Sequence, residues 1–280
     1  NDPQWGLLSA INLSTGKMEN VNPKASIEYI DISDTKECLS MTEFMKGADS
    51  VFLLAAKARV QPSIENPVEY EQNNTIGTLN VLKSASDAGV RRVVYSASSS
   101  AYGNTDKLPS VESDPVNPMS PYGAQKYYGE VMCKMFSEVY GLETVSLRYF
   151  NIYGERQNVG GAYAMVIGIF VDQLLNGKPM TITGNGEQRR DFTYVGDVVN
   201  ANILASQSEN VGKGEVINIG NGDNRSINEL ADMIGGDIVN IAPVIEPRET
   251  LANNSKAEEL LGWKPTQNIE DWIPKYKKDM

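Results

Sequence analysis

The chain has 280 residues, of which 41% are apolar and 22% charged, and its 25 Lys and Arg against 36 Asp and Glu give a formal net charge of −11. This length allows one large or two ordinary globular domains, and the acidic balance argues against nucleic acid or a membrane surface as partner. There is no histidine, which excludes Ser-His-Asp and Cys-His catalysis and histidine-ligated metals. Acid-base chemistry must therefore come from tyrosine, lysine or carboxylates.

Cysteines and apolar runs narrow the class further. Cys38 and Cys133 are the only cysteines, so neither a disulfide framework nor a cysteine-based metal site is expected, and a reducing cytoplasm suits them. The longest apolar run, residues 162–171, is much shorter than the roughly 20 residues that a membrane-spanning helix needs. We expect a cytoplasmic protein that acts on a small molecule and has no metal, nucleic-acid or membrane partner.

Short β-rich runs alternate with helical patterns through the first half of the chain. Strands are predicted at residues 27–32, 51–55, 92–96 and 144–149, and helices at residues 76–88 and after Ser120, which can cap its helix. The apolar stripe of this second helix, expected to face the core, comprises Tyr128, Val131, Met132, Met135, Phe136 and Val139. The alternation predicts an α/β fold with a Rossmann-like, doubly wound parallel sheet covered by helices.

The pattern of predicted strands and helices changes after residue 150. Strands are predicted at residues 179–183 and 215–219, and helices from Asp197 and from Ser226. Ser255 and Glu258 have the spacing of a capping box that opens a short helix ending at Gly262. We expect a dinucleotide-binding domain at residues 1–150 and a smaller α/β substrate lobe at residues 151–280, with the chain crossing between them.

Tyr122 and Lys126 are the first chemistry-bearing pair. They lie four residues apart at the start of the helix after Ser120, so both side chains project from one face. A nearby ammonium stabilises phenolate, and because the ordinary pKa of tyrosine is about 10, such a shift allows acid-base work near neutral pH. The spacing alone often arises by chance, so its surroundings decide its meaning.

A cluster of hydroxyl groups precedes this pair. Three serines occupy residues 98–100, directly after the predicted strand at residues 92–96. Doubly wound sheets bind ligands at the carboxyl ends of their parallel strands. A serine run is usually only a turn, but here strand, hydroxyl cluster and Tyr/Lys helix follow one another in order.

From Leu13 onward the chain resembles the extended short-chain dehydrogenase/reductase family, specifically its NAD-dependent sugar-nucleotide epimerases. The longest matching motifs are Asn-Thr-Ile-Gly-Thr at 74–78, Ser-Pro-Tyr-Gly-Ala-Gln-Lys at 120–126, Arg-Tyr-Phe-Asn-Ile-Tyr-Gly at 148–154 and Gly-Glu-Gln-Arg-Arg-Asp-Phe at 186–192. Shorter matches lie at residues 13–16, 31–32, 54–56, 96–103 and 255–257.

The resemblance implies NAD as cofactor and a role for each matching residue. Ser98 would be the catalytic hydroxyl, Tyr122 the base, and Lys126 the residue that lowers the tyrosine pKa and holds the nicotinamide ribose. Asp31 and Ile32 would flank the adenine. The other implied cofactor contacts are Asn12, Ser14 and Thr15, the phosphate and ribose side at Leu54, Ala55 and Ala56, the loop contact Asn74, and Tyr149 at the nicotinamide.

The implied substrate contacts lie on both halves of the chain. Ser98, Ser99 and Tyr122 would contact the sugar, and Asn151, Arg190 and Arg248 the nucleotide diphosphate, which guanidinium groups bind bidentately. Each arginine could instead form a surface or interlobe ion pair. Thr250 matches a position where some family members carry a bulky residue that limits the space around the sugar 2-substituent. Because threonine is small, an N-acetylated hexose is expected to fit.

The reaction implied is epimerisation at carbon 4 of a UDP-hexose or UDP-N-acetylhexosamine. Tyrosinate takes the 4-hydroxyl proton while NAD takes hydride; the 4-keto sugar turns over and hydride returns to its other face. A dehydratase of the same family would carry an Asp-Glu pair where Ser99 and Ser100 stand, so dehydration is disfavoured. A reductase and a catalytically silent sugar-nucleotide-binding protein remain as alternatives.

Two further expectations concern the family pattern. The family begins with a strand and a Gly-rich loop that receives the pyrophosphate, and these residues contain no such loop, so we expect either an incomplete version of a normal enzyme or a relative with impaired NAD binding. The family resemblance also implies a homodimer paired through two helices of each subunit, for which the helix containing Tyr122 is a candidate.

Overall fold

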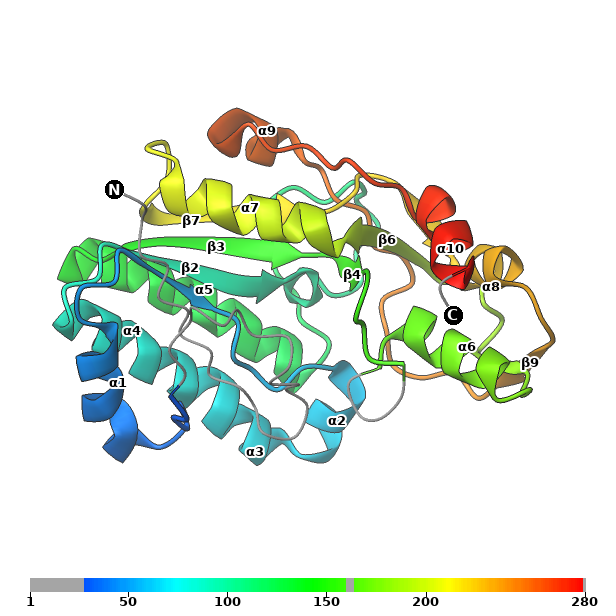
Figure 1. Ribbon diagram of the computed structural model, residues 1–280, viewed down its shortest axis with the longest axis horizontal. Helices are drawn as coiled ribbons and strands as arrows, with labels where there is room; N and C mark the ends of the chain where they lie inside the picture. Colours follow the sequence, from blue (N-terminus) through cyan, green and yellow to red (C-terminus); the bar gives the residue numbers. More distant parts are fainter. Residues whose placement is uncertain (1–27, 160–163, 279–280) are drawn as a thin grey trace.

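The structure is a computed structural model that describes residues 28–159 and 164–278. Its largest sheet within these residues has four parallel strands in the order β1-β2-β3-β7 (Figure 1). The strands are β1 (Ser50–Leu53), β2 (Arg92–Ser98), β3 (Glu143–Tyr149) and β7 (Lys213–Ile219). All four run in the same direction, so their carboxyl ends meet at one edge. The predicted parallel sheet is confirmed.

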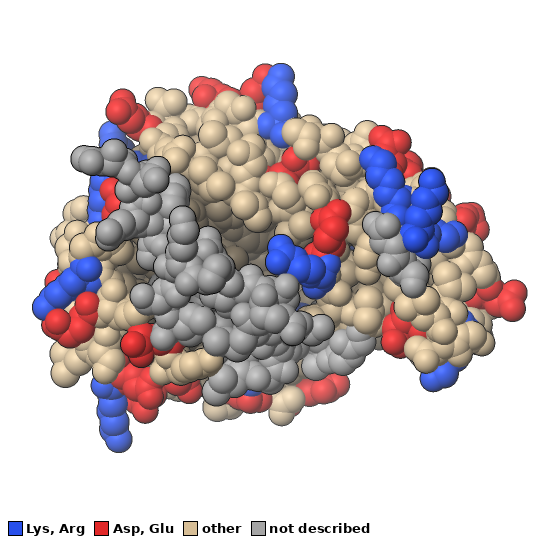
Figure 2. Space-filling model, in the orientation of Figure 1, with Lys and Arg blue, Asp and Glu red and all other residues tan. Residues whose placement is uncertain are grey.

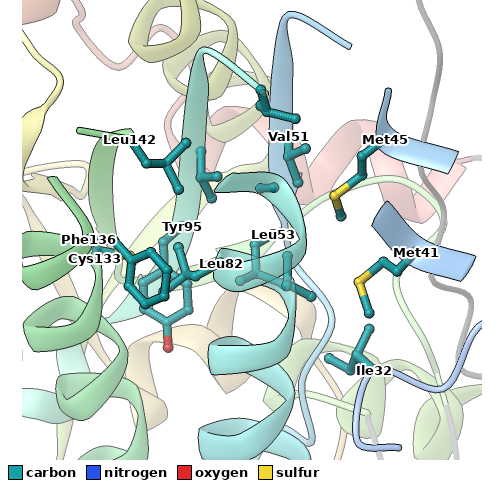
Figure 3. Packing of buried hydrophobic residues seen from close by; sticks show 14 of the residues in the cluster. Ile32, Met41, Met45, Val51, Leu53, Leu82, Tyr95, Cys133, Phe136 and Leu142 are labelled. Atoms are coloured by element: carbon teal, nitrogen blue, oxygen red, sulfur yellow. The ribbon is translucent and has the colours of Figure 1, made fainter. Parts of the chain in front are cut away.

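Helices cover both faces of this sheet (Figure 1). On one face lie α1 (Cys38–Met45), α4 (Gly77–Asp87) and α5 (Pro121–Tyr140), and on the other α7 (Val195–Gln207) and α9 (Ser255–Leu261). Successive residues of a strand point to opposite faces, so Tyr95 of β2 packs with Phe136 of α5 whereas Val94 packs with Ala201 of α7. Figure 3 shows the first of these cores, where Met41 and Met45 of α1 lie opposite β1.

The first predicted strand is wrong over the residues that can be described. Residues 28–31 have no regular structure, and residues 32–33 form a turn before the 3₁₀ helix η2 (Thr35–Glu37). The carboxylate of Asp31 accepts hydrogen bonds from the backbone N–H (2.9 Å) and the hydroxyl (2.7 Å) of Ser33. This local turn competes with strand pairing. Ile32 is nevertheless buried in the α1/α4 core, which explains the apolar pattern.

Several short helical segments connect β1 to α4. They are α2 (Val60–Glu65), α3 (Pro67–Glu71) and the π-helix η3 (Gln72–Ile76). A single π turn inside a helical stretch is frequent at functional sites because it re-aims side chains. The helix predicted at residues 76–88 is confirmed as α4, and Gly89, with φ +71°, follows its C-cap as expected.

The start of α5 matches the prediction, but its apolar stripe does not. Ser120 caps the helix by accepting the N–H of Gly123 (3.1 Å), and Gly141 ends it in the left-handed region. Phe136 is buried, and Met132 and Met135 pack against the core. The stripe residues outside the core are Tyr128, Val131 and Val139, all exposed. The stripe is wider than the part of the helix that the sheet covers, so one side of it faces outward.

The second group of elements lies beside the first sheet (Figure 1) and has its own hydrophobic core. Its strands are β4 (Asn151–Tyr153), β6 (Arg189–Tyr194) and β8 (Asn224–Ser226) in one sheet, and β5 (Met180–Thr183) paired with β9 (Ile238–Ile241) in another. Its helices are α6 (Val166–Leu175), α8 (Ile227–Ile234) and α10 (Ile269–Lys278). Phe170, Leu230 and Trp272 are among the buried residues. Because β7 and α7 belong to the first sheet, the chain crosses between the two groups; a boundary at residue 150 stays a prediction.

One of the two capped helix starts differs from the sequence pattern. Ser226 and Glu229 form a complete capping box at α8, where each side chain accepts the other's backbone N–H. The capping box predicted for Ser255 and Glu258 is wrong, since Ser255 is already the first residue of α9 and its N-cap is Asn254. The helix still ends at Gly262 in the left-handed region, as predicted.

Candidate functional site

Ser98 and Tyr122 meet at the carboxyl edge of the sheet. Ser98 is the last residue of β2, where the 3₁₀ helix η4 (Ser99–Ala101) begins, and its hydroxyl accepts the N–H of Ser100 (3.2 Å). Tyr122 lies on the first turn of α5, and its phenol is near enough to the Ser98 side chain for the serine to influence its pKa. The strand end and the helix start thus bring together two groups that lie 24 positions apart in the sequence. Ser99 follows at the same edge and is partly exposed.

Lys126 is buried one turn further along α5. Its ammonium donates to the carbonyl of Ser96 (2.8 Å) and lies 4.9 Å from the centre of the Tyr95 ring, a cation–π distance. Burial lowers the pKa of Lys126 to about 8, and the nearby Cys133 and Glu130 oppose the shift. The ammonium is therefore held by the strand backbone and by an aromatic ring.

The pKa of Tyr122 is raised, whereas the predicted role of Tyr122 as a base requires a lowered pKa. Burial raises the pKa of Tyr122, and the neighbouring Ser98 side chain lowers it only in part. The ammonium of Lys126 is bonded to Ser96, and this placement leaves burial as the dominant effect on the phenol. Formation of phenolate at neutral pH thus requires positive charge closer to the phenol than this arrangement supplies.

The loop after β1 lies next to these residues in the sheet order and is fixed by Asn74. The Asn74 side chain accepts the N–H of Lys57 (2.7 Å) and donates to the Lys57 carbonyl (3.0 Å) and to Gln125 of α5 (3.0 Å). It is only 1% exposed, so its amide shapes the loop from the protein side. Leu54, directly after β1, is 61% exposed, and the small Ala55 and Ala56 follow it.

Sequence reasoning missed Lys57, which stands in this loop directly after the Leu-Ala-Ala match. Its ammonium forms an ion pair with Glu69 of α3. A basic residue just past the carboxyl end of a parallel strand is a usable signal for an anion site. The position of Lys57 beside Ala55 and Ala56 could therefore have been noticed.

The remaining expected cofactor contacts are placed less directly. Asp31 is exposed and its carboxylate is bonded to Ser33, while the side chain of Ile32 is in the core. Tyr149 at the end of β3 lies 3.2 Å from the Ser96 hydroxyl and donates to Asn202 of α7 (2.9 Å). Their roles toward a cofactor stay predictions. Asn12, Ser14 and Thr15 lie outside the described residues.

Arg190 and Arg248 come close together on neighbouring segments of the second lobe. Arg190 is a mostly buried residue of β6, and its guanidinium is ion-paired with Glu246. Arg248 is exposed, and its backbone carbonyl accepts the N–H of Arg189 (2.9 Å). Thr250 continues along β6, where its hydroxyl accepts the N–H of Asp191 (3.2 Å). Of the two alternatives for Arg190, the structure shows the ion pair, and its role toward the diphosphate stays a prediction.

Asn151 begins β4 and pairs in register with Phe192 of β6. Its side chain is partly exposed, and its contact with a ligand stays a prediction. Its position beside the strand that carries Arg190 agrees with the expected grouping of substrate contacts.

Asp191 is a second residue that sequence reasoning missed. Its buried carboxylate accepts the backbone N–H groups of Asn221 (2.6 Å), Gly222 (3.0 Å) and Ala252 (3.0 Å). Burial raises its pKa to about 6, although these hydrogen bonds oppose the shift. Asp191 thus ties β6 to the turn after β7 and to the segment that carries Arg248 and Thr250.

One face of the molecule is hollowed. Figure 2 shows a hollow near the middle of this face, with basic and acidic side chains next to each other at its edge.

Over residues 28–159 and 164–278 there is no group of three or more His, Cys, Asp or Glu side chains that could hold a metal ion. In the same ranges, no helix has both the length and the apolarity that crossing a membrane requires.

A parallel sheet with Ser98 at a strand end, Tyr122 and Lys126 on the next helix, and an arginine-bearing second lobe define a dinucleotide-dependent enzyme of the short-chain dehydrogenase type. Comparison with known families agrees. Residues 4–220 match the family described as NAD dependent epimerase/dehydratase family, and the chain belongs to this family. NAD is the cofactor that the family uses.

Individual relatives are similar over nearly the whole chain. A UDP-glucose 4-epimerase of Mycolicibacterium smegmatis is 34% identical, covering 96% of this chain and 89% of the relative. Two solved structures are each 35% identical and cover 96% of this chain and 89% of their own. One is a UDP-N-acetylglucosamine 4-epimerase from Methanobrevibacter ruminantium M1 in complex with UDP-N-acetylmuramic acid (TM-score 0.87), and the other a UDP-glucose 4-epimerase from Thermotoga maritima with UDP-glucose (TM-score 0.88).

Proposed function

We propose that the chain is an NAD-dependent 4-epimerase of a UDP-hexose or UDP-N-acetylhexosamine. The observation that carries the proposal is the placement of Tyr122 beside Ser98 with Lys126 buried one turn away, in a chain of this family. The similarity to UDP-sugar 4-epimerases over most of the chain supports the choice of reaction and substrate class.

The residues present suit NAD at the carboxyl edge of the sheet. When bound, NAD supplies the hydride acceptor and donor for carbon 4. An ammonium has three N–H donors, and within the described residues the one hydrogen-bond acceptor on Lys126 is the Ser96 carbonyl. Two donors therefore remain for ribose hydroxyls, which is the chemistry expected of this residue. We further propose that Asn74 acts by shaping the loop that contains Ala55 and Ala56.

The protonation chemistry belongs to Tyr122 and Ser98. In its ionised form Tyr122 accepts the proton of the sugar 4-hydroxyl, and it returns that proton after the sugar has turned over. Ser98 lies beside the phenol and is placed to orient the same sugar hydroxyl. Because burial holds the Tyr122 pKa above its ordinary value, the base forms only when positive charge is brought beside the phenol.

The second lobe supplies the nucleotide site in this proposal. Arg190 and Arg248 bind the diphosphate, and Asn151 supports them from β4. Thr250 stands near the sugar, and its small side chain suits a 2-acetamido group. The dehydratase alternative is less well supported, since Ser99 and Ser100 cannot act as the acid and base that elimination of water needs.

Product analysis tests the proposal directly. The chain is incubated with NAD and UDP-glucose or UDP-N-acetylglucosamine, and the sugars are separated afterwards. We expect the 4-epimer; a keto-deoxy sugar would support the dehydratase instead, and no product from a folded, NAD-saturated chain would favour a silent binding protein.

Replacement of the proposed base gives the sharper experiment. Tyr122→Phe keeps the ring but removes the proton acceptor, so we expect turnover to fall by roughly a thousandfold while UDP binding is retained. Tyr127→Phe is the matched control, because Tyr127 lies on the same helix with an exposed ring. Equal activity of the two variants would refute the role of Tyr122.

We also propose that two copies pair through the outer side of α5 and that the protein is cytoplasmic. Tyr128 and Val131 of α5 are exposed beside Val68 of α3, and a groove between these helices is lined by Val68, Pro121 and Tyr128. A second copy of the same surface would cover these apolar groups. The free thiols of Cys38 and Cys133 support a reducing compartment.

A further inference from the structure

The guanidinium of Arg190 already has an anion within the protein. Its Nη1 donates to the carbonyl of Arg189 (2.8 Å), and its Nη2 forms an ion pair with Glu246. The Arg190 side chain is 8% exposed, whereas that of Glu246 is 29% exposed. The arginine is therefore fixed and buried, and the glutamate reaches it from the surface side.

Glu246 is held by more than this ion pair. Its Oε1 accepts hydrogen bonds from the Thr183 hydroxyl (3.2 Å) and from Nε2 of Gln188 (3.3 Å), while Oε2 is the atom paired with Arg190. Gln188 is anchored in turn, because its Nε2 also donates to the Thr183 carbonyl (3.0 Å). The two carboxylate oxygens thus have separate partners, one neutral set and one cation.

The negative charge of Glu246 balances the positive charge of the buried Arg190. A buried guanidinium needs an anion beside it, and burial lowers the pKa of Arg190 while Glu246 raises it. Glu246 also stands two residues before Arg248, on the segment that runs beside β6. A diphosphate at these two arginines would compete with the carboxylate for the same N–H donors.

We propose that Glu246 is a resident anion that occupies Arg190 and competes with the nucleotide diphosphate, and that it thereby sets the affinity for the sugar nucleotide. The inference rests on the proposed function, in which Arg190 receives the diphosphate. When the diphosphate binds, Oε2 of Glu246 gives up Arg190, and the bonds of Oε1 to Thr183 and Gln188 keep the carboxylate nearby. When the nucleotide leaves, the ion pair re-forms, and this competition assists the release of the charged product.

Binding of UDP alone, measured by calorimetry, tests this without cofactor or turnover. In Glu246→Gln the amide keeps the shape and one acceptor oxygen but removes the competing charge. We expect the Kd for UDP to fall by about fivefold to tenfold and to rise more steeply with salt, since more of the positive charge is then free for the ligand. A merely structural role of Glu246 would weaken binding instead.

Two further variants isolate the mechanism. Glu249→Gln removes a charge from the same segment, but Glu249 is bonded to the amide of Asn224 (2.8 Å) and, within the described residues, to no basic side chain; we expect less than a twofold change. In Arg190→Gln the effect of Glu246→Gln should vanish, because the contested cation is gone.

The outcomes separate this inference from the proposed function. Tighter UDP binding in Glu246→Gln that disappears in the Arg190→Gln background supports the inference. Unchanged or weaker binding in Glu246→Gln, or equal tightening in Glu249→Gln, overturns it while UDP binding by the wild type leaves the proposed function in place. If neither the wild type nor Glu246→Gln binds UDP, both fail together.

Discussion

Burial controls the proton affinity of the groups that form the site. The pKa of Lys126 is lowered to about 8, that of Tyr122 is raised, and that of Asp191 is raised to about 6, in each case because the charged form loses its water. All three shifts favour the neutral form of the group. The site is therefore poised so that an added charge, from substrate or cofactor, changes the ionisation of the residues around it.

Asp191 gives a stability prediction at this scale. Its pKa in the folded chain is about 6, above the ordinary value of an aspartate, so the folded state binds the proton more tightly. The resulting stabilisation is present at low pH and is lost as the pH rises through 6. Relative to Asp191→Asn, which does not titrate, the wild type should gain on the order of 1 kcal/mol of unfolding free energy between pH 7 and pH 5.

Urea unfolding at several pH values measures this difference. Asp232→Asn is the matched control, because Asp232 is exposed; its stability should follow the wild type over the same range. A constant difference between the wild type and Asp191→Asn from pH 7 to pH 5 would show that Asp191 does not titrate there.

The residues differ in how visible they are in the sequence. Tyr122 and Lys126 are one helical turn apart and Ser98 ends a strand, so local rules alone group them. Asp191 and Glu246 are not accessible in this way, because their partners Ala252 and Arg190 lie 61 and 56 residues away along the chain. Their importance follows from the folding of β6 against a distant segment.

At the scale of elements, the position of α5 depends on a glycine. A Cβ added at Gly129 would lie 2.2 Å from the hydroxyl oxygen and 2.3 Å from the ring of Tyr95 on β2. The absence of a side chain at Gly129 lets the helix approach the strand, and the Tyr95 hydroxyl reaches the carbonyl of Lys126 (3.4 Å). This close packing of α5 on β2 places Lys126 within hydrogen-bond distance of the Ser96 carbonyl.

Gly129→Ala should therefore destabilise the fold. Helix propensity alone predicts a gain of about 1 kcal/mol for this exchange, whereas overpacking against Tyr95 predicts a loss of about 1–3 kcal/mol. We expect a net loss in unfolding free energy and a lower kcat, because α5 must move and displace Lys126. Chemical denaturation decides between the two effects by sign: a more stable variant would mean that the helix is not pressed against Tyr95.

Elements with strong local signals are those the sequence predicts well. Ser120, Gly141 and Gly89 mark the ends of α4 and α5 through capping and left-handed backbone. The alternation at residues 27–32 is typical of a strand, but the side chain of Asp31 satisfies the backbone of Ser33 locally. Such competition depends on a single rotamer, which a pattern of hydrophobicity does not encode.

At the scale of the whole molecule, the two halves of the sequence build one sheet together. β7, which follows β4, α6, β5 and β6 of the second lobe, pairs with β3 along its length, and Asp191 joins the turn after β7 to β6. The nucleotide and sugar contacts proposed here therefore sit between parts of the chain that fold as a unit. The parallel sheet and its helical layers were predictable from alternation, whereas this crossing depends on pairing between distant strands.

The outward side of α5 leads to a prediction about assembly. Val131 is 43% exposed and lies on the proposed pairing surface with Tyr128 and Val68. Val131→Glu would place a charge, and its symmetry mate, inside a buried apolar interface, which is strongly unfavourable. We expect the wild type to sediment as a dimer at tens of micromolar and Val131→Glu to sediment as a monomer, with UDP binding retained because the site lies at the sheet edge.

Val199→Glu is the matched control: Val199 is also exposed but lies on α7, across the sheet, so this variant should remain dimeric. If both variants dissociate, or if the wild type is already monomeric, α5 is not the pairing surface.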